Sequence, residues 1–411
     1  MKAIIIGGGI GGIISALVLR HQGIEVELYE RAEGNPEIGS AVQFTANVTN
    51  IFKRIGLLEL VKACGSPVGV RNMREWNTGN IISTNRLGDT IAEKELGSPY
   101  LVFGRSELLD RLGEKLPEGV AHYGMKCVAV EQDGNGVRAT FENGHVATGD
   151  VLIGADGIRS TVRRLVFGEV EPVFSGKVAY RGLIPSSELP DFESYKWIAN
   201  AWPAPGQFLL QNFAGRETIN LSLYRNNQRL EDFDTGNRTA VVPTEQVLGF
   251  VRDWEPSAKE WLSKSADYLR WPLFDIEPLK SWAKGRVALL GDAAHATLPF
   301  IGQGAGQGAE DASALGDALA YMSDDPVSAL KLYEEFRLPR ASRVQLESRA
   351  RSNYMMLKDP FAINQRNLQW REASKAITGY FGNSVDHWIL AYDVAREFEA
   401  HVARRGATSA A

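Results

Sequence analysis

The residues best suited to chemistry begin with the glycine motif Gly7-x-Gly9-x-x-Gly12. An aliphatic stretch (Ala3–Ile6) precedes it, an Ala/Leu-rich stretch to about Arg20 follows, and a second strand-like stretch ends at Glu30. This order predicts a strand, a tight turn, a helix and a parallel strand. The glycines allow a pyrophosphate to approach the backbone at the helix N-terminus, and Glu30 can accept hydrogen bonds from two ribose hydroxyls. The motif predicts a dinucleotide site, disfavours a ribose 2′-phosphate there, and does not distinguish NAD from FAD.

A second acidic turn follows the apolar run that starts at Asp150 and ends in Asp156-Gly157. Arg163 and Arg164 lie in the helix expected after it. Asp and Gly are common at strand-to-helix junctions because they cap helices and form turns. The segment is therefore either a capped junction or a second contact with the cofactor.

The third segment again predicts a strand, then an acidic residue, then the glycine-rich start of a helix, with Asp292 after the strand and Pro299 in the following loop. Its helix start carries almost no side chains: Gly302, Gly304, Ala305, Gly306 and Gly308. Bare backbone amides there suit a flat, electron-rich ligand, and Asp292 can accept from a polyol hydroxyl. We interpret His295, which stands between alanines, as a packed, hydrogen-bonded residue and assign it no proton transfer.

The elements around these motifs predict a mixed α/β (α+β) fold: a Rossmann-like domain, an inserted β-sheet domain and a helical C-terminal region. Strand-like segments separated by Pro/Gly turns mark the insertion, at Tyr180-Arg-Gly, Gln207–Gln211 and Thr218–Tyr224. From Ala305 the pattern is helical, with a long amphipathic stretch from Pro326 to about Met356. We expect a cofactor domain at 1–75, 100–176 and 277–325, a substrate domain at 76–99 and 177–276, and a helical region at 326–411.

The composition is that of a globular protein with a small-molecule partner. The 411 residues include 45 Lys plus Arg and 50 Asp plus Glu, a net charge of -5 that gives no basic surface for nucleic acid or membranes. Cys64 and Cys127 form no paired motif, and the uncharged run Ala3–Leu19 contains too many glycines for a spanning helix. We expect a cytoplasmic monomer or homodimer.

The sequence contains none of the motifs that would indicate the other enzyme classes considered. It has no Gly-x-Ser-x-Gly elbow of a hydrolase and no P-loop. The six histidines show no paired ligand spacing, so no metal site is expected.

The three motifs, in this order, resemble the single-component FAD-dependent monooxygenases that hydroxylate aromatic rings, closest to the salicylate hydroxylase and 3-hydroxybenzoate 6-hydroxylase branch. The similarity extends over most of the chain, through these segments: Gly7–Gly12, Glu30-Arg31, the helix at Asn47, Phe103-Gly-Arg105, Gly154-Ala-Asp156-Gly, Ala179-Tyr-Arg-Gly182, Trp271-Pro-Leu-Phe-Asp and Gly291–His295.

The resemblance implies roles for individual residues. Glu30 would bind the adenosine ribose, Arg105 would lie along the ribityl and diphosphate side of FAD, and Asp292 would bind the ribitol. Asp156 would serve both FAD and the passing nicotinamide cofactor, while the amides of Gly304–Gly306 would meet the pyrimidine carbonyl of the flavin. The full set of cofactor-binding candidates is Gly7, Gly9, Ile10, Gly12, Glu30, Arg31, Val42, Arg105, Val128, Asp156, Asp292, Gly304, Ala305 and Gly306.

The implied chemistry is reduction of FAD by transiently held NADH or NADPH, followed by oxygen transfer from a flavin hydroperoxide to an aromatic ring. A salicylate-like hydroxylated acid is the expected substrate, and its hydroxylation could be decarboxylative. The alternatives are a heteroaromatic or polyketide-like substrate, epoxidation or N-hydroxylation in the same fold, and a non-catalytic flavin-binding protein.

The pocket strand departs from the branch, because some members carry a histidine and a tyrosine where this chain has Gln207 and Gln211. Glutamine cannot act as a base, so no catalytic residue is assigned. The candidates for the substrate pocket are Arg181, Gln207, Leu209, Gln211, Tyr224 and Pro299.

Overall fold

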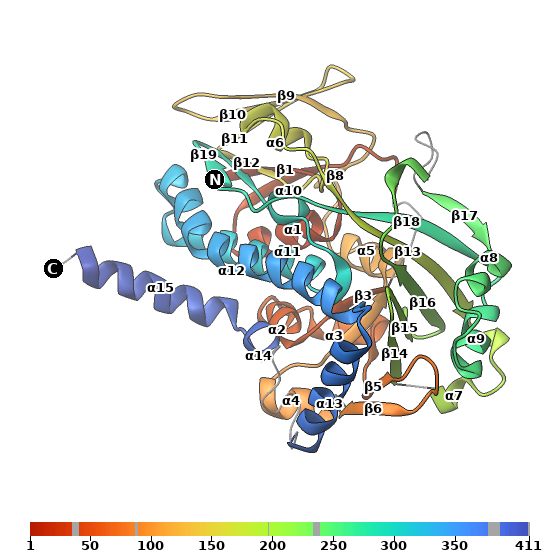
Figure 1. The fold of residues 1–411 in the computed structure, drawn as a ribbon. Helices are drawn as coiled ribbons and strands as arrows, with labels where there is room; N and C mark the ends of the chain where they lie inside the picture. The colour runs from red at the N-terminus through yellow and green to blue at the C-terminus, as the bar shows by residue number, and fades with distance from the viewer. Residues whose placement is uncertain (35–40, 87–88, 196, 233–238, 377–386, 410–411) are drawn as a thin grey trace.

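The computed structural model describes residues 1–34, 41–86, 89–195, 197–232, 239–376 and 387–409 (Figure 1). The N-terminal unit is the expected β-α-β arrangement of β1 (Lys2–Ile6), α1 (Ile10–His21) and β2 (Glu25–Tyr29). Strand β1 is the centre of a six-stranded sheet in which Ile4 lies opposite both Leu152 and Glu27. The order is β19-β20-β12-β1-β2-β8, with β8 (Ala121–His122), β12 (Val151–Gly154), β19 (Ala283–Lys284) and β20 (Val287–Leu289).

The strands β20, β12, β1, β2 and β8 run parallel, so their carboxyl ends meet at one edge. This places the turns after β1, β12 and β20, which hold the three predicted motifs, side by side. The apolar run Ala3–Leu19 is divided between β1 and α1. No helix in the described ranges has the length and hydropathy needed to span a bilayer.

Helices cover the six-stranded sheet. The longest are α11 (Gly304–Tyr321), which packs on α1, and α12 (Pro326–Met355), which packs on α11 (Figure 1). The expected amphipathic stretch from Pro326 is thus one helix. Further helices are α2 (Ala46–Arg54), α3 (Leu58–Cys64), α4 (Asp89–Leu96), α5 (Arg105–Gly113), α6 (Thr161–Val166), α10 (Asp292–His295), α14 (His387–Leu390) and α15 (Val394–Ser409). Helix α13 (Pro360–Ala376) packs instead on the strand β6 (Ile81–Arg86) of the second large sheet.

Two small sheets complete this part. One joins β3 (Ala41–Phe44), β7 (Leu101–Gly104) and β4 (Ser66–Pro67), and the other joins β11 (Val146–Gly149), β10 (Val137–Phe141) and β9 (Cys127–Gln132).

The predicted insertion is an eight-stranded sheet with the order β17-β18-β13-β16-β15-β14-β5-β6. Its strands are β5 (Val70–Arg74), β6 (Ile81–Arg86), β13 (Val173–Pro185), β14 (Ile198–Ala204), β15 (Gln207–Phe213), β16 (Thr218–Arg225), β17 (Ala240–Pro243) and β18 (Asp267–Asp275). Its outer side carries α8 (Thr244–Gly249) and α9 (Pro256–Ser263), as Figure 1 shows, with α7 (Phe192–Tyr195) and the short 3₁₀ turns η1 (Ser186–Glu188) and η2 (Leu230–Asp232) at its margins.

The mixed α/β class, the Rossmann-like unit and the inserted sheet are confirmed, but two predicted boundaries need correction. Strand β5 belongs to the eight-stranded sheet, although residues up to 75 were expected in the cofactor domain. Strand β13 starts at Val173, four residues before the expected boundary. The sequence around each of these strands does not indicate which sheet the strand joins, because its pairing partners are distant in the chain. The division into domains is otherwise still a prediction.

Candidate cofactor and substrate site

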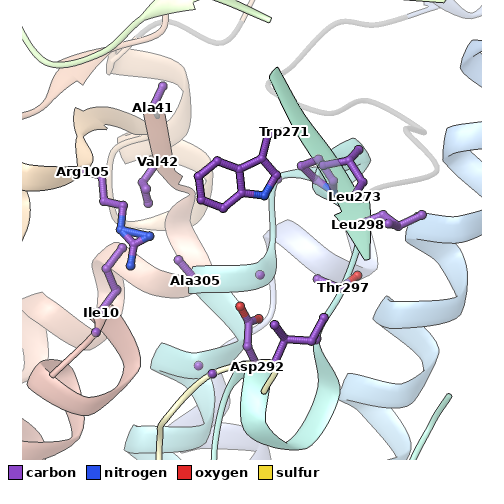
Figure 2. Close-up of a pocket in the computed structure, with 18 of the residues that line it drawn as sticks. Ile10, Ala41, Val42, Arg105, Trp271, Leu273, Asp292, Thr297, Leu298 and Ala305 are labelled. Carbon is purple, nitrogen blue, oxygen red and sulfur yellow. The ribbon is translucent and has the colours of Figure 1, made fainter. Parts of the chain in front are cut away.

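Two adjoining cavities lie between the motif edge of the six-stranded sheet and one face of the eight-stranded sheet. The larger has a volume of about 570 Å³ and the smaller about 170 Å³. They share the wall residues Gln43, Leu210, Asn212, Tyr224, Pro299 and Gly302. The larger cavity receives all three predicted motifs, and Figure 2 shows its side chains.

The first glycine motif forms a turn that has no room for side chains. Gly7 has φ +114°, and a Cβ there would lie 2.4 Å from the carbonyl oxygen of Ala155. A Cβ on Gly12 would lie 1.9 Å from the carbonyl oxygen of Gly7. A Cβ on Gly9, in contrast, would meet no atom within 4 Å, because Gly9 and Ile10 border the larger cavity. Gly7 and Gly12 therefore shape the turn, and Gly9 leaves space for a ligand.

Glu30 lies behind this turn and holds it. Its Oε2 accepts from the N–H of Gly8 at 2.6 Å and its Oε1 accepts from the N–H of Ala32 at 2.9 Å. Each carboxylate oxygen has a further lone pair, so hydroxyl groups of a ribose can still be bound. The neighbouring Arg31 is exposed and does not border the cavity.

Asp156 caps a helix, which was one of its two interpretations. Its Oδ2 accepts from the N–H of Thr161 at 2.7 Å and of Val162 at 3.1 Å, and its Oδ1 accepts from the hydroxyl of Ser160. Burial raises the pKa of Asp156, although these hydrogen bonds oppose the shift. The residues that border the cavity here are its neighbours, including Ala155 and Gly157. A direct contact of Asp156 with FAD or a nicotinamide is still a prediction.

Asp292 and Arg105 point into the larger cavity from different elements (Figure 2). Asp292 follows Gly291, whose φ of +61° turns the chain after β20. The side chain of Asp292 has exposed surface, which borders the cavity, and the surrounding protein raises the pKa of its carboxylate, while the charges of His295 and Arg105 oppose that rise. Burial likewise lowers the pKa of Arg105, and Asp292 opposes this. A carboxyl group and a guanidinium group therefore border the space that a polar ligand would occupy.

The N-terminus of α11 offers bare amides beside this pair. Its N-cap residue, Gln303, provides no side-chain cap, and Gly304 and Ala305 border the cavity. Helix α1 is similar, since its N-cap is Gly9 and no side chain caps it. Two uncapped helix N-termini suit the diphosphate and the electron-rich ring of FAD. The residues present thus fit the cofactor, with Gly306 just behind the cavity wall.

Two cofactor candidates differ in position. Val42 borders the larger cavity as expected, but Val128 does not, and 40% of its surface is exposed. Strand β9 alternates, so Cys127 points into the core and the next side chain points outward. The side chain of Val128 is therefore not part of this cavity.

A buried ionic network beneath Asp292 was missed by the sequence reasoning. Asp311 of α11 accepts from the N–H of Gly291 at 3.0 Å, pairs with Nε2 of His295 at 2.5 Å and accepts from Nε of Arg337 at 2.9 Å. Arg337 also donates to Glu310 at 2.7 Å. His295 is hence the packed, hydrogen-bonded residue that was expected. The acids and Arg337 lie on different helices, so no local spacing marks them.

The pocket strand β15 was assigned the wrong face. Gln207, Leu209 and Gln211 point away from both cavities. Leu209 lies in the core under α8 and α9, Gln207 donates to the carbonyl of Phe250 at 3.1 Å, and Gln211 accepts from Asn200 at 2.7 Å. Side chains alternate along a strand, so a choice wrong by one residue moves the whole set to the opposite face. The cavity side of β15 carries Phe208, Leu210 and Asn212.

The other pocket candidates lie at the cavities. Tyr224 and Pro299 border both. Arg181 borders only the larger one, with its guanidinium 5.6 Å from the ring centre of Trp271 and its buried Nε without a hydrogen-bond partner.

The smaller cavity has an aromatic wall. The ring of Tyr224 lies 5.8 Å from that of Phe208 and 4.9 Å from that of Phe300, which belongs to the 3₁₀ turn η3 (Pro299–Ile301). Such rings provide flat apolar surface for another ring. Among the described residues that border this cavity there is no histidine, lysine or carboxylate.

Comparison with known proteins identifies the family to which this chain belongs. A family model described as FAD binding domain matches residues 1–206 and 259–348. A 3-amino-4-hydroxybenzoate 2-monooxygenase from Streptomyces platensis is 33% identical, over 86% of this chain and 88% of that protein. A 3-hydroxybenzoate 6-hydroxylase from Aquipseudomonas alcaligenes is 32% identical, over 89% and 92%. The structure of a salicylate hydroxylase substrate complex matches with a TM-score of 0.80 and 26% identity, over 97% of each chain. The chain therefore belongs to the family of FAD-dependent aromatic-ring monooxygenases, the single-component flavin hydroxylases.

Proposed function

We propose that this enzyme hydroxylates a one-ring aromatic carboxylic acid that already carries a ring hydroxyl, with NADH or NADPH as the reductant. The observation that carries the proposal is the small, aromatic-walled cavity that adjoins the larger cavity. Its volume of about 170 Å³ is close to that of cavities of about 150 Å³ that accommodate benzene. The size favours one ring over a polyketide-like substrate. The relatives named above also act, by their names, on hydroxylated benzoates.

Residues that line the larger cavity, together with Glu30 behind the glycine turn, would bind successive parts of the cofactor. Gly9 and the N-terminus of α1 would hold the diphosphate, Glu30 the ribose, Asp292 and Arg105 the ribityl side, and the amides at Gly304 and Ala305 the pyrimidine end. When bound and reduced, FAD activates dioxygen for transfer of one oxygen atom to the ring.

The chain's part in the reaction is to orient the ring and exclude water. Phe208, Tyr224 and Phe300 would hold the ring at the junction of the cavities. Without a histidine or carboxylate among the described residues of that wall, proton removal from a phenol would involve a tyrosine hydroxyl, or the ring would arrive ionised.

The test is oxidation of NADH and of NADPH by the purified protein with salicylate, 3-hydroxybenzoate, 3-amino-4-hydroxybenzoate, 6-hydroxynicotinate and anthranilate. Bound FAD, oxidation stimulated by a hydroxybenzoate and a product heavier by one oxygen atom would support the proposal. Carbon dioxide release measured in the same reaction decides whether hydroxylation is decarboxylative. Stimulation of the oxidation by 6-hydroxynicotinate alone would favour a heteroaromatic substrate. If none of the acids stimulated it, the proposal that the substrate is a simple aromatic carboxylic acid would be refuted.

A further inference from the structure

Arg71 is a charged residue in the wall of the smaller cavity that no motif marks. It lies on β5, opposite Ala199 of β14 and Asn85 of β6, and all three border the cavity. The side chain is half-buried. An arginine on the cavity face of a sheet offers a fixed fork of N–H donors to a ligand.

A hydrogen-bonded chain orients this guanidinium. One Nη of Arg71 donates to the hydroxyl of Tyr100 at 2.7 Å, and this hydroxyl donates to Oε1 of Gln43 at 2.6 Å. Tyr100 is only 3% exposed, and Nε2 of Gln43 donates to the carbonyl of Ile301 at 3.4 Å. The chain thus connects Arg71 with η3, whose first residue, Pro299, borders both cavities.

The charged residues that border the smaller cavity favour an anionic ligand. Among the described residues that border the smaller cavity, Arg71 and Arg351 are positive and none is negative. Arg351 comes from α12 on another side of the cavity and lies 3.4 Å from Glu347, one helical turn earlier. A cavity wall with this charge favours a ligand with a carboxylate over its neutral analogue.

The spacing of strands places the two ends of such a ligand. Strand β5 is separated from β15 by β14, a distance of about 10 Å at about 4.8 Å per strand. Arg71 borders only the smaller cavity, whereas Leu210, Asn212 and Tyr224 border both. A carboxylate at β5 would therefore leave the ring at β15 and β16, at the junction with the cofactor cavity.

We propose that Arg71 binds the carboxylate of the aromatic substrate and thereby sets which ring carbon faces the flavin, with Tyr100 as a positioning residue for Arg71. This inference rests on the proposed function for the identity of the ligand. Guanidinium and carboxylate match in two parallel hydrogen bonds, so the contact also fixes the orientation of the ring.

The experiment compares binding of an acid and its neutral amide to the FAD-loaded enzyme. The probes are 3-hydroxybenzoate and 3-hydroxybenzamide, salicylate and salicylamide, and 3-amino-4-hydroxybenzoate and its amide, followed by the change in the flavin absorption spectrum. For Arg71→Gln we expect the Kd of the acid to rise on the order of 10- to 100-fold, while the Kd of the amide stays within about twofold. Tyr100→Phe should raise KM for the acid by a smaller factor and leave kcat at saturation unchanged.

Arg74→Gln is the matched control. Arg74 lies on the same strand but on the opposite face, where its Nε donates to Asn200 at 2.9 Å. The same loss of charge there should not change the ratio of acid to amide affinity. Equal FAD content in all variants shows that the cofactor site is intact.

Three results would overturn the inference. These are unchanged acid affinity in Arg71→Gln, an equal loss for acid and amide, or loss of acid preference in Arg351→Gln alone. Failure of the proposed function is separate, because binding needs no turnover. An enzyme that binds an acid through Arg71 without hydroxylating it refutes the function alone, and one that binds none of the acids refutes both.

Discussion

Arg337→Met removes the central cation of the buried network under the cofactor turn. Arg337, Glu310 and Asp311 have side chains with no exposed surface. Without Arg337, Glu310 keeps two bonds from Arg340, at 2.8 and 2.9 Å, and Asp311 keeps His295 and the N–H of Gly291. Breaking a buried pair by removing one partner costs about 3–5 kcal/mol. That is a large part of the roughly 5–15 kcal/mol of a typical domain.

The assay is chemical denaturation of the enzyme at pH 7 with saturating FAD, followed by tryptophan fluorescence and by circular dichroism. Lys126→Met is the control, because the pair of Lys126 and Glu142 at 2.7 Å is exposed and such pairs contribute less than about 1 kcal/mol. Neutralising Asp311 in the Arg337→Met background, with Asp311→Asn, should restore part of the loss, whereas Glu310 stays paired with Arg340. A loss below about 1 kcal/mol in Arg337→Met would refute the argument that uncompensated buried charge dominates.

The same network sets a dependence on pH. Burial alone would raise the pKa of Glu310, but Arg340 and Arg337 reverse this, so its pKa is lowered. The pKa of Asp311 is lowered in the same way by His295 and Arg337. Carboxylates with a lowered folded-state pKa stabilise the protein above the unfolded value, about 4, and lose this effect as the pH falls through the folded-state value. The difference in unfolding free energy between wild type and Arg337→Met should therefore shrink at low pH.

Three further predictions concern the cofactor turn and the cysteines. Asp292→Ala and Arg105→Ala should each weaken FAD binding by about 1–3 kcal/mol, measured by flavin fluorescence on titration of the apoprotein, and full flavin affinity in both would refute their assignment. Gly9→Ala should weaken FAD binding but leave apoprotein stability nearly unchanged, because its Cβ meets no protein atom, whereas Gly12→Ala should lower apoprotein stability by about 1–3 kcal/mol. Burial raises the pKa of the Cys64 and Cys127 thiols to about 11, so neither should react with iodoacetamide at pH 8 until the protein unfolds, and rapid labelling of the native enzyme would contradict this.

Local patterns were enough to predict which turns meet at the larger cavity. The glycine turn, the strand before it and Glu30 lie within thirty residues, and the geometry they need is local. The turns after β12 and β20 were also predicted, because each follows a short apolar strand and parallel strands bring their carboxyl ends together. Val128 and Arg31 show the limit, since nothing local says whether a side chain beside such a turn points inward.

The substrate half could not be predicted in the same way. Strand β15 reads Gln-Phe-Leu-Leu-Gln-Asn-Phe, and both of its faces are covered. A sheet that is buried on both faces lacks the polar and apolar alternation that identifies the inner face. Arg71 resembles a solvated surface residue in the sequence, and its partner Tyr100 lies 29 positions away. The pairing of β5 with β14 and β6 brings it to the cavity.

The buried network explains why the third motif needs the C-terminal helices. Gly291 is held at positive φ by the bond from its N–H to Asp311, and this turn directs Asp292 into the cavity. Asp311 belongs to α11, whose first residues, Gly304 and Ala305, border the same cavity. One helix therefore provides amides at its N-terminus and anchors the acidic turn with its second turn, while Arg337 of α12 fixes that anchor. A shift of α12 would thus move the acid and the amides together relative to FAD, which is why loss of Arg337 should be felt at the cofactor as well as in stability.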